Sequence, residues 1–579
     1  MVPQQAPEGE NMQTLKKFIC EKIIGVLGEI SPSAAELETY FEYPPNPEMG
    51  DLALACFKLS KTMRKAPAVI ATGLAEALQG KTDGYFDDMQ AVSGYLNFFI
   101  ADSYRVNVVL TSILNHGDEY GRGHEGDGKT MCIDFSSINI AKPFHIGHLG
   151  TTAIGHSLRR IYAFSGYHCV GINHLGDWGT QFGRLIVAYK GWGSKEDVEL
   201  GGVAELSRIY KEFYIKAEED PSLHDQAKAW FTAMENGNRE ALELWNWFKE
   251  ISLSEFKKTY DLLGIEFESW AGESFYNDQM QAVVDELTEK RLLEKSDGAM
   301  LVNLEEDGMP PCLILKNDGS TLYATRDIAA AIYRYHTYGF DTSLYVTDAG
   351  QSLHFAQFFK VIEKMGYPWA SRLRHVPYGK ISVGGQKLAT RTGNVVLLSE
   401  LFDDAIKRVY AIIDAKNPQL ANKDEVARKV GVGAVIFNQL STGRIKDVNF
   451  VWEDALNFDG NTGPYVQYTY ARSCSVLAKA GERLSSSLSW SLSREEKELL
   501  NLLVLFPQKV EQAKNECEPS VITRYILDIC ACYNRFYHNC PILKAEGDTK
   551  ELRLRLCEAF KAIAGRALWL IGLEKTEAV

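Results

Sequence analysis

The spacing of apolar and polar positions divides the chain into three parts. Residues 13 to about 102 begin with LKKFICEKIIGVLGEI, whose apolar spacing predicts a helix, and end on AVSGYLNFFI, whose alternating, aromatic-rich composition predicts a strand. A small α+β domain is therefore predicted here. The glycine-rich, charged stretch HGDEYGRGHEGDGK that follows is predicted to be a linker.

In the second part, residues 125–450, strand-like runs alternate with helical ones. Strands are predicted at MCIDF, YHCVGIN and LYVTDAG, and helices from about His148 to Phe164 and through FAQFFKVIEKMG. Alternation with crossovers of this length predicts an α/β fold with a parallel sheet covered on both faces. The mainly helical residues from about 191 to 313 are predicted to be an insertion between the two halves of the sheet.

The third part is predicted to be all α-helical, because apolar residues keep helical spacing from about Ser399 to the end. We place a separate α-helical domain at residues 458–579. A chain of 579 residues needs several domains, since single cores stop growing near about 250 to 300 residues.

Charge and cysteine usage narrow the class of protein. The net charge of −14 argues against a protein that coats nucleic acid nonspecifically, because such binding needs Lys and Arg at phosphates. Residues 458–579 hold 16 Lys+Arg and 15 Asp+Glu, so the excess negative charge lies in the rest of the chain. The net charge therefore does not exclude a local RNA-binding site. The polar start, the short apolar runs and 11 cysteines without a C-x-x-C pair predict a cytoplasmic protein with reduced thiols, no membrane span and no metal site.

The first candidate site lies in IDFSSINIAKPFHIGHLG, where a strand ends at Phe135 and a helix begins near His148. A strand-to-helix turn presents backbone N–H groups to an anion, which suits a nucleotide phosphate. His145 and His148 flank Gly147, whose lack of a side chain allows close approach of a ligand. The pair alone also fits a helix cap or half of a metal site, because H-x-x-H is common by chance.

The wider context resembles a known family. FHIGH resembles the HIGH motif of class I aminoacyl-tRNA synthetases, and SSINIAKPFHIGHL with NHLGDWGTQFGRLI resembles the arginyl-tRNA synthetases. The resemblance continues through TLYATRDIAAA, YVTDAGQSLHFAQFF and FDGNTGPYVQYTYARS, from about Thr130 onward. It implies a tRNA-elbow-binding domain at 13–102, a Rossmann-like catalytic domain at 125–450 and an anticodon-binding domain at 458–579.

The resemblance also implies which residues bind arginine. A guanidinium is permanently charged and its planar donors suit a carboxylate. The implied contacts are Asp134, Ser137, Asn139, Tyr323, Asp327 and Gln351. Taken singly, Asp327 fits equally well a pair with Arg326 or a helix cap, and Asp134 fits a surface acid at a strand end.

The loop GKISVGGQKLATRTGNVV resembles a degenerate KMSKS loop, which implies cations that stabilise charge developing on pyrophosphate. Lys387 and Arg391 stand at its two basic positions, and Lys142 or Lys380 is a candidate to share the role. The implied ATP contacts are His145, Gly147, His148, Lys387 and Thr390. The sequence departs from the family at Ile138, usually proline, at Gly150, often arginine, and at Asp134, which is shorter than glutamate.

The implied reaction is activation of L-arginine with ATP and Mg²⁺ to arginyl-adenylate and pyrophosphate, followed by transfer to the 3′-terminal ribose of tRNA(Arg). We expect a monomer that contacts the tRNA through Tyr95, Asn97, Arg472 and Tyr537. Two alternatives stay open: a class I synthetase for another amino acid, such as cysteine or glutamate, and a noncatalytic tRNA-binding relative.

Overall fold

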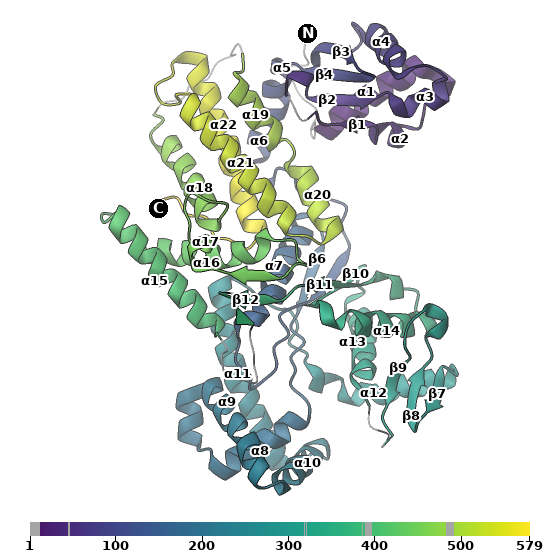
Figure 1. Cartoon of the computed structure of the whole chain (residues 1–579), viewed down its shortest axis with the longest axis vertical. Helices are drawn as coiled ribbons and strands as arrows, with labels where there is room; N and C mark the ends of the chain where they lie inside the picture. Colours follow the sequence, from purple (N-terminus) through teal and green to yellow (C-terminus); the bar gives the residue numbers. More distant parts are fainter. Residues whose placement is uncertain are drawn as a thin grey trace.

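The computed structural model describes residues 12–44, 47–317, 319, 321–384, 386–387, 396–481 and 491–578. Figure 1 shows an elongated molecule with the parallel sheet at its middle. The N-terminal domain lies beside the C-terminal helices at one end, and a helical insertion lies at the other. The predicted fold class, with its three kinds of domain, is confirmed.

The N-terminal domain is a four-stranded antiparallel sheet, in the order β1-β2-β4-β3, packed against helices. The predicted first helix and last strand are both present, as α1 and β4. The elements are α1 (Met12–Leu27), α2 (Ala34–Glu38), β1 (Phe41–Glu42), β2 (Leu52–Ala55), α3 (Phe57–Met63), α4 (Pro67–Leu78), β3 (Phe86–Val92) and β4 (Tyr95–Ile100). Helix α6 (Thr111–His116), which follows, packs against α22 (Gly547–Leu570) of the C-terminal part.

The central sheet has four parallel strands in the order β11-β10-β5-β6. Its elements are β5 (Thr130–Asp134), α7 (Leu149–Phe164), β6 (His168–Ile172), α13 (Tyr323–Tyr338), β10 (Thr342–Asp348), α14 (Ser352–Lys364) and β11 (Leu373–Tyr378). The chain leaves β5 toward one edge of the sheet and β10 toward the other. The carboxyl ends of these two neighbouring strands therefore form a topological switch point, where open α/β sheets bind ligands.

The two faces of the sheet are built by alternation of side chains along each strand. Ile133 and Val346 pack into a core shared with α7, whereas Cys132 and Tyr345 pack into a second core with α13 and α14. By the same alternation Asp134, two residues after Cys132, faces the α13 side. The first acid of the predicted site thus lies between β5 and α13.

The helical insertion follows β6 and consists of long helices followed by a small antiparallel sheet. Its elements are α8 (Thr180–Trp192), α9 (Lys195–Glu219), α10 (Ser222–Glu235), α11 (Arg239–Leu263), α12 (Met280–Glu289), β7 (Leu293–Ser296), β8 (Ala299–Val302) and β9 (Cys312–Leu315). The helices lie at the far end of the molecule from the N-terminal domain (Figure 1).

The C-terminal part is helical except at one short strand. The helices are α15 (Leu398–Lys416), α16 (Lys423–Ser441), α17 (Trp452–Ala455), α18 (Gly463–Ala478), α19 (Arg494–Leu503), α20 (Phe506–Glu516), α21 (Ser520–Asn539) and α22 (Gly547–Leu570). The prediction of helix throughout from Ser399 is wrong at β14 (Val448–Phe450), which pairs with β12 (Ile381–Val383). Three residues carry too little periodicity to reveal a strand whose partner lies far away in the sequence.

The described residues contain no helix long and apolar enough to cross a membrane. Within the same ranges the cysteines are unpaired, and ten of the 11 are buried.

Gly155 lets α7 lie directly on β5. A Cβ at this position would stand 2.3 Å from Phe135, so the helix or the strand would have to move. We expect Gly155→Ala to lower the free energy of unfolding by about 1 to 3 kcal/mol. Gly73→Ala in α4 is the matched control, because its Cβ would meet nothing within 4 Å. Denaturant titration measures both, and equal stability of the two variants would contradict this packing role.

Candidate active site

The loop that follows β5 has an unusual backbone. Ser136, Ser137 and Ala141 have φ of 70°, 41° and 59°, in the left-handed region that residues other than glycine rarely adopt. Such strain persists only where surrounding structure enforces it, and it clusters at functional sites.

Helix α11 of the insertion holds this loop in place. The hydroxyl of Tyr260 lies 2.8 Å from that of Ser136, and Ser252 Oγ accepts a hydrogen bond from the amide of Ala141 at 3.0 Å. The insertion therefore contributes directly to the shape of the site.

The HIGH residues form a compact turn before α7. The amide of Gly147 donates to His145 Nδ1 at 3.1 Å, and the amide of His145 donates to His148 Nδ1 at 3.3 Å. The two imidazole rings lie 4.0 Å apart. Because Nδ1 of His145 accepts from Gly147, that ring carries its proton on Nε2, where it can donate to a ligand oxygen. Nδ1 of His148 lies between the amide and the carbonyl of His145, at 3.3 and 3.2 Å.

Burial keeps both imidazoles neutral. It is the main cause that lowers the pKa of His145, with Lys142 adding to the effect, and it lowers the pKa of His148 to about 3, with His145 adding to the effect. At neutral pH the turn therefore offers two neutral N–H donors.

The first predicted acid, Asp134, is 7% exposed and has one protein partner on each carboxylate oxygen. Its Oδ1 accepts a hydrogen bond from Ser137 Oγ at 2.7 Å, and its Oδ2 lies 2.8 Å from the guanidinium of Arg334. The structure thus brings two predicted residues together. It adds a buried cation that the sequence interpretation did not include.

The second predicted acid, Asp327, lies 2.6 Å from Nε2 of His354. Its neighbour Arg326 lies 3.6 Å from Glu273 instead, so the alternative pairing of Arg326 with Asp327 is not the one observed. Asp327 sits in the second turn of α13 rather than at its N-terminal cap. Its carboxylate stays partly accessible to a ligand.

Three further predicted residues lie on segments that adjoin the elements of these acids. Tyr323 begins α13 and is 69% exposed. Gln351 lies exposed in the short turn after β10, and Asn139 forms an isolated bridge with Gly176. All three lie on segments that follow strands of the switch point or begin the helix that covers it.

His174, which follows β6, lies among these charges. Burial and then Arg334 lower the pKa of His174, while Asp134, Asp327 and Asp177 oppose the shift. Both predicted arginine-binding acids therefore act electrostatically on the same imidazole.

Glu273 provides a test of the electrostatics beside this centre. Burial raises the pKa of Glu273 from 4.5 to about 7, against the opposing effect of Arg326. A raised pKa means that the folded state holds the proton more tightly, so this stability is lost as pH rises from about 4.5 through 7.

We expect Glu273→Gln, which cannot ionise, to raise stability at pH 8 relative to pH 5 by about 1 to 3 kcal/mol. Melting temperatures at the two pH values measure the difference, with Glu289→Gln on exposed α12 as the control. A gain that is equal at both pH values would contradict the raised pKa.

The candidate KMSKS residues lie mostly outside the described residues. The backbone of Lys387 belongs to β13 (Gln386–Lys387), whereas Thr390 and Arg391 are not described. The segment that follows is fastened to the HIGH turn, because Ile146 donates to the carbonyl of Val396 at 3.0 Å and Leu398 donates to that of Phe144 at 2.9 Å. One end of the candidate loop is therefore fixed beside the two histidines.

The structure accounts for two departures from the family pattern. A Cβ on Gly150 would lie 2.8 Å from the ring of Tyr378, so no arginine fits at this position without movement of the tyrosine. Ile138 is fully buried in the core. Lys142 is exposed near the HIGH turn, where it can face a ligand.

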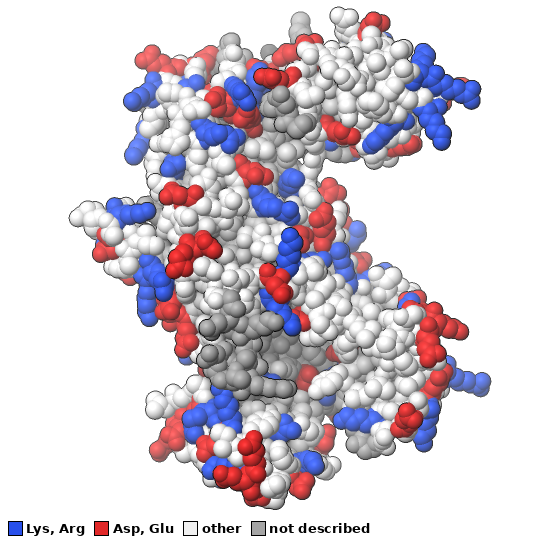
Figure 2. Space-filling model, in the orientation of Figure 1, with Lys and Arg blue, Asp and Glu red and all other residues white. Residues whose placement is uncertain are grey.

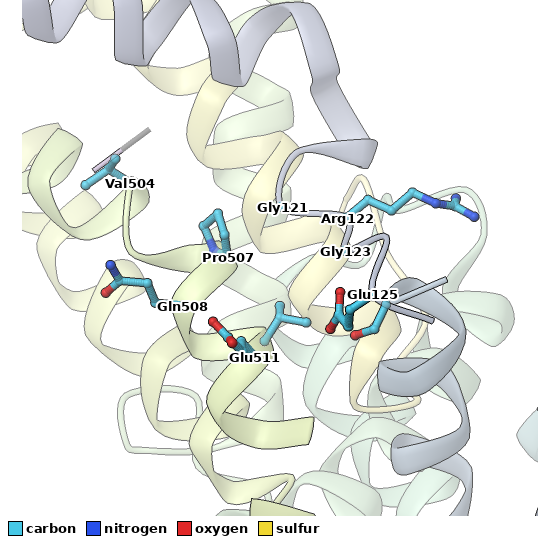
Figure 3. A pocket seen from close by; sticks show the side chains of 10 residues that line it. Gly121, Arg122, Gly123, Glu125, Val504, Pro507, Gln508 and Glu511 are labelled. Carbon is cyan, nitrogen blue, oxygen red and sulfur yellow. The ribbon is translucent and has the colours of Figure 1, made fainter. Parts of the chain in front are cut away.

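A cavity of about 300 Å³ lies away from these residues, between the linker and α20 (Figure 3). Gly121, Glu125, Pro507 and Glu511 are among its lining residues. None of the predicted site residues lines it, so it is not the candidate active site.

The sequence interpretation missed Arg334, His354, His174 and Glu273. Arg334 carried a signal, because it is a cation in the otherwise apolar helix IAAAIYRY, seven positions after Asp327 and thus on the same helix face. His174 and His354 lie inside the quoted motifs NHLGDWGTQFGRLI and YVTDAGQSLHFAQFF, which drew attention to those segments but not to the two histidines, and no pattern marks Glu273.

Comparisons with known proteins agree along the chain. Family models match at residues 13–100 (Arginyl tRNA synthetase N terminal domain), 109–452 (tRNA synthetases class I (R), catalytic domain) and 466–579 (DALR anticodon binding domain). The arginine–tRNA ligase of Alkaliphilus metalliredigens is 49% identical over 94% of this chain and 96% of its own. That of Clostridium perfringens is 46% identical over 97% and 99%.

Solved structures show the same fold. The arginyl-tRNA synthetase of Thermus thermophilus gives a TM-score of 0.81 at 24% identity, over 98% of this chain and 100% of its own. The Plasmodium falciparum enzyme gives 0.79 at 24% identity, over 98% and 99%. With the HIGH turn and the paired acids at the switch point, these matches show that the chain belongs to the arginyl-tRNA synthetases, the class I family of arginine–tRNA ligases.

Proposed function

We propose that, in the ligase reaction of this family, Asp327 and Asp134 each bind one of the two cationic groups of the substrate arginine. Asp327 takes the guanidinium, because its carboxylate is partly accessible and suits planar donors. Asp134 and Ser137 take the α-ammonium, with Asn139, Tyr323 and Gln351 completing the site. The observation that carries this assignment is the difference between the partners of the two acids: Asp134 lies 2.8 Å from the guanidinium of Arg334, whereas Asp327 lies 2.6 Å from the imidazole of His354.

ATP binds across the HIGH turn in this proposal. The Nε2–H groups of His145 and His148 donate to phosphate oxygens, and Gly147 leaves space for the nucleotide. The cations Lys387, Arg391 and Lys142 neutralise the pyrophosphate as it leaves, and the hydroxyl of Thr390 donates a hydrogen bond to ATP. Mg²⁺ would be coordinated mainly by the phosphates of ATP and would need few protein ligands. The connection of the HIGH turn to Val396 and Leu398 supports this joint role.

The chemistry then proceeds in two steps. A carboxylate oxygen of arginine attacks the α-phosphorus of ATP in line, and the bond to the bridging oxygen of pyrophosphate breaks. The terminal ribose hydroxyl of tRNA next attacks the carbonyl carbon of arginyl-adenylate, and AMP leaves with the electron pair. The side chains position the reactants and stabilise charge, with no covalent intermediate on the enzyme.

A stack of three side chains supports RNA binding by the C-terminal domain. The guanidinium of Arg472 lies 4.9 Å from the ring centre of Tyr468 and 5.2 Å from that of Tyr537. Both tyrosines are exposed, at 39% and 37%. Asn534 accepts a hydrogen bond from Arg472 and so helps to hold the stack. We propose that this stack receives an unpaired tRNA base.

A basic end of the N-terminal domain supports a second RNA contact. Figure 2 shows blue side chains gathered at the α3 end of this domain. The exposed cations there are Lys58, Lys61, Arg64 and Lys65. Exposed Phe57 meets Tyr95 edge to face at 5.3 Å, so an aromatic surface adjoins the cations. Asn97 is only 3% exposed, so we propose the contact for Tyr95 and not for Asn97.

Arg472→Ala tests the C-terminal stack. We expect the KM for tRNA to rise about tenfold, in line with about 1 to 3 kcal/mol for one stacked base. The KM for arginine should stay unchanged in aminoacylation assays. Arg494→Ala, at an exposed position of α19, is the control. An unchanged KM for tRNA in Arg472→Ala would remove the stack from the RNA interface.

The whole assignment is tested by ATP–pyrophosphate exchange with purified enzyme, run with and without tRNA. Exchange should depend on arginine and not on lysine, glutamate or cysteine. Absence of arginine-dependent exchange in the presence of tRNA would overturn the assignment. Light scattering of the same sample tests the proposed monomer.

A further inference from the structure

Arg334 is a buried cation at the amino-acid site with no role yet assigned. It is 1% exposed and is among the largest fully buried side chains of the described residues. It lies on α13, two turns beyond Asp327, and reaches back toward the end of β5. Burial of such a cation is costly unless a partner offsets the charge, so its position needs a reason.

Its partners connect it to the proposed substrate contacts. The Arg334 guanidinium lies 2.8 Å from Asp134 Oδ2 and 5.5 Å from the ring centre of Tyr345. Tyr345 and Asp134 are direct neighbours in the β10–β5 pairing. The hydroxyl of Ser137 donates a hydrogen bond to the other carboxylate oxygen, Oδ1 of Asp134. The carboxylate is thus held from two sides and cannot rotate freely.

The two acids of the site differ in the cation that accompanies them. Asp134 faces a guanidinium that stays charged: burial acts to lower its pKa, but Asp134 and the two tyrosines Tyr276 and Tyr345 raise the pKa of Arg334 well above its usual value. Asp327 faces the imidazole of His354 at 2.6 Å, which unlike a guanidinium is not a permanent cation. A second permanent cation is therefore attracted more strongly by Asp327 than by Asp134.

Substrate arginine itself carries two cationic groups, an α-ammonium and a guanidinium. With two equivalent carboxylates it would bind in either direction, and only one direction brings its carboxylate to ATP. We propose that Arg334 is a positioning residue that fixes Asp134 and offsets its charge, so that the substrate guanidinium binds at Asp327 and the α-ammonium at Asp134. This inference rests on the proposed function of the two acids.

Arginine-dependent ATP–pyrophosphate exchange, in the presence of tRNA, tests the role of Arg334. We expect Arg334→Met to raise the KM for arginine about 10- to 100-fold and to leave the KM for ATP within about twofold of the wild-type value. Arg334→Lys should recover part of the loss, because it keeps the charge but not the planar geometry. A KM for arginine within about twofold of wild type in both variants would overturn the inference.

A second comparison separates positioning from general stability. If Arg334 acts through Asp134, then removing it in an Asp134→Asn background should add no more than about a twofold further rise in the KM for arginine, because coupled residues are not additive. A full additive rise would overturn the inference. This double variant carries no unpaired buried charge, so it also serves if Arg334→Met fails to fold.

Arg105→Met is the matched control, because Arg105 is 4% exposed and pairs with buried Asp51 far from the site in the sequence and the fold. It should lower the melting temperature without changing the KM for arginine. If wild-type enzyme shows no arginine-dependent exchange, the proposed function fails. If wild type is active and the Arg334 variants keep its KM, only the role of Arg334 fails.

Discussion

Replacement of Asp327 by alanine is expected to raise the KM for arginine more than any other single change in the amino-acid site. The guanidinium would enter a partly buried position without its carboxylate, which costs about 2 to 5 kcal/mol, or roughly 30-fold to several-thousand-fold in kcat/KM. His354 would also lose its partner at 2.6 Å. The KM for ATP should change little, since Asp327 pairs with His354 and not with the described residues of the HIGH turn.

Exchange kinetics at varied arginine and fixed ATP measure this effect. Asp327→Asn keeps the shape of the side chain and removes the charge, so it should lose nearly as much as alanine if the charge is what matters. Asp285→Ala, on the exposed face of α12, is the control. Unchanged arginine kinetics in Asp327→Ala would move the guanidinium contact elsewhere, and Asp134 would then be the next candidate.

The sequence predicted where the candidate site residues lie in the fold better than it predicted which side chains they contact. Strand alternation and the turn before α7 placed His145, His148 and Asp134 correctly at the carboxyl end of β5, because these features depend on local spacing. The partners of the acids depend on helices that return from far along the chain. Arg334 contacts Asp134 from 200 positions away in the sequence. The spacing of apolar residues in one sequence gives no information about a pairing over such a separation.

The same reasoning explains the errors in the fold. β14 forms only because Val448–Phe450 pairs with Ile381–Val383, and its three residues have no independent strand signal. The resemblance implied an RNA contact at Asn97, yet the packing of the N-terminal domain leaves Asn97 only 3% exposed in β4. In both cases the tertiary partner, rather than the local sequence, decides exposure and structure.

Replacement of His148 by alanine is expected to give the largest loss in the chemical step. In the proposed arrangement its Nε2–H faces the ATP phosphates while Nδ1 accepts from the amide of His145. Loss of one such oriented donor typically lowers kcat about 100- to 1,000-fold. His148→Asn, which keeps an N–H donor, should recover part of the rate, and His116→Ala at the surface should leave it unchanged.

The pH dependence distinguishes a neutral donor from a charged one. With a pKa of about 3, His148 stays neutral above about pH 5, so its titration should add no inflection to kcat between pH 6 and 8. Because the folded pKa is below the unfolded value of 6.5, the unfolded chain binds more protons, and stability contributed by neutral His148 is lost as pH falls below 6.5 toward 3. An inflection near pH 6.5 that disappears in His148→Ala would instead show a charged imidazolium, and the phosphate would then be bound by charge rather than by an oriented neutral donor.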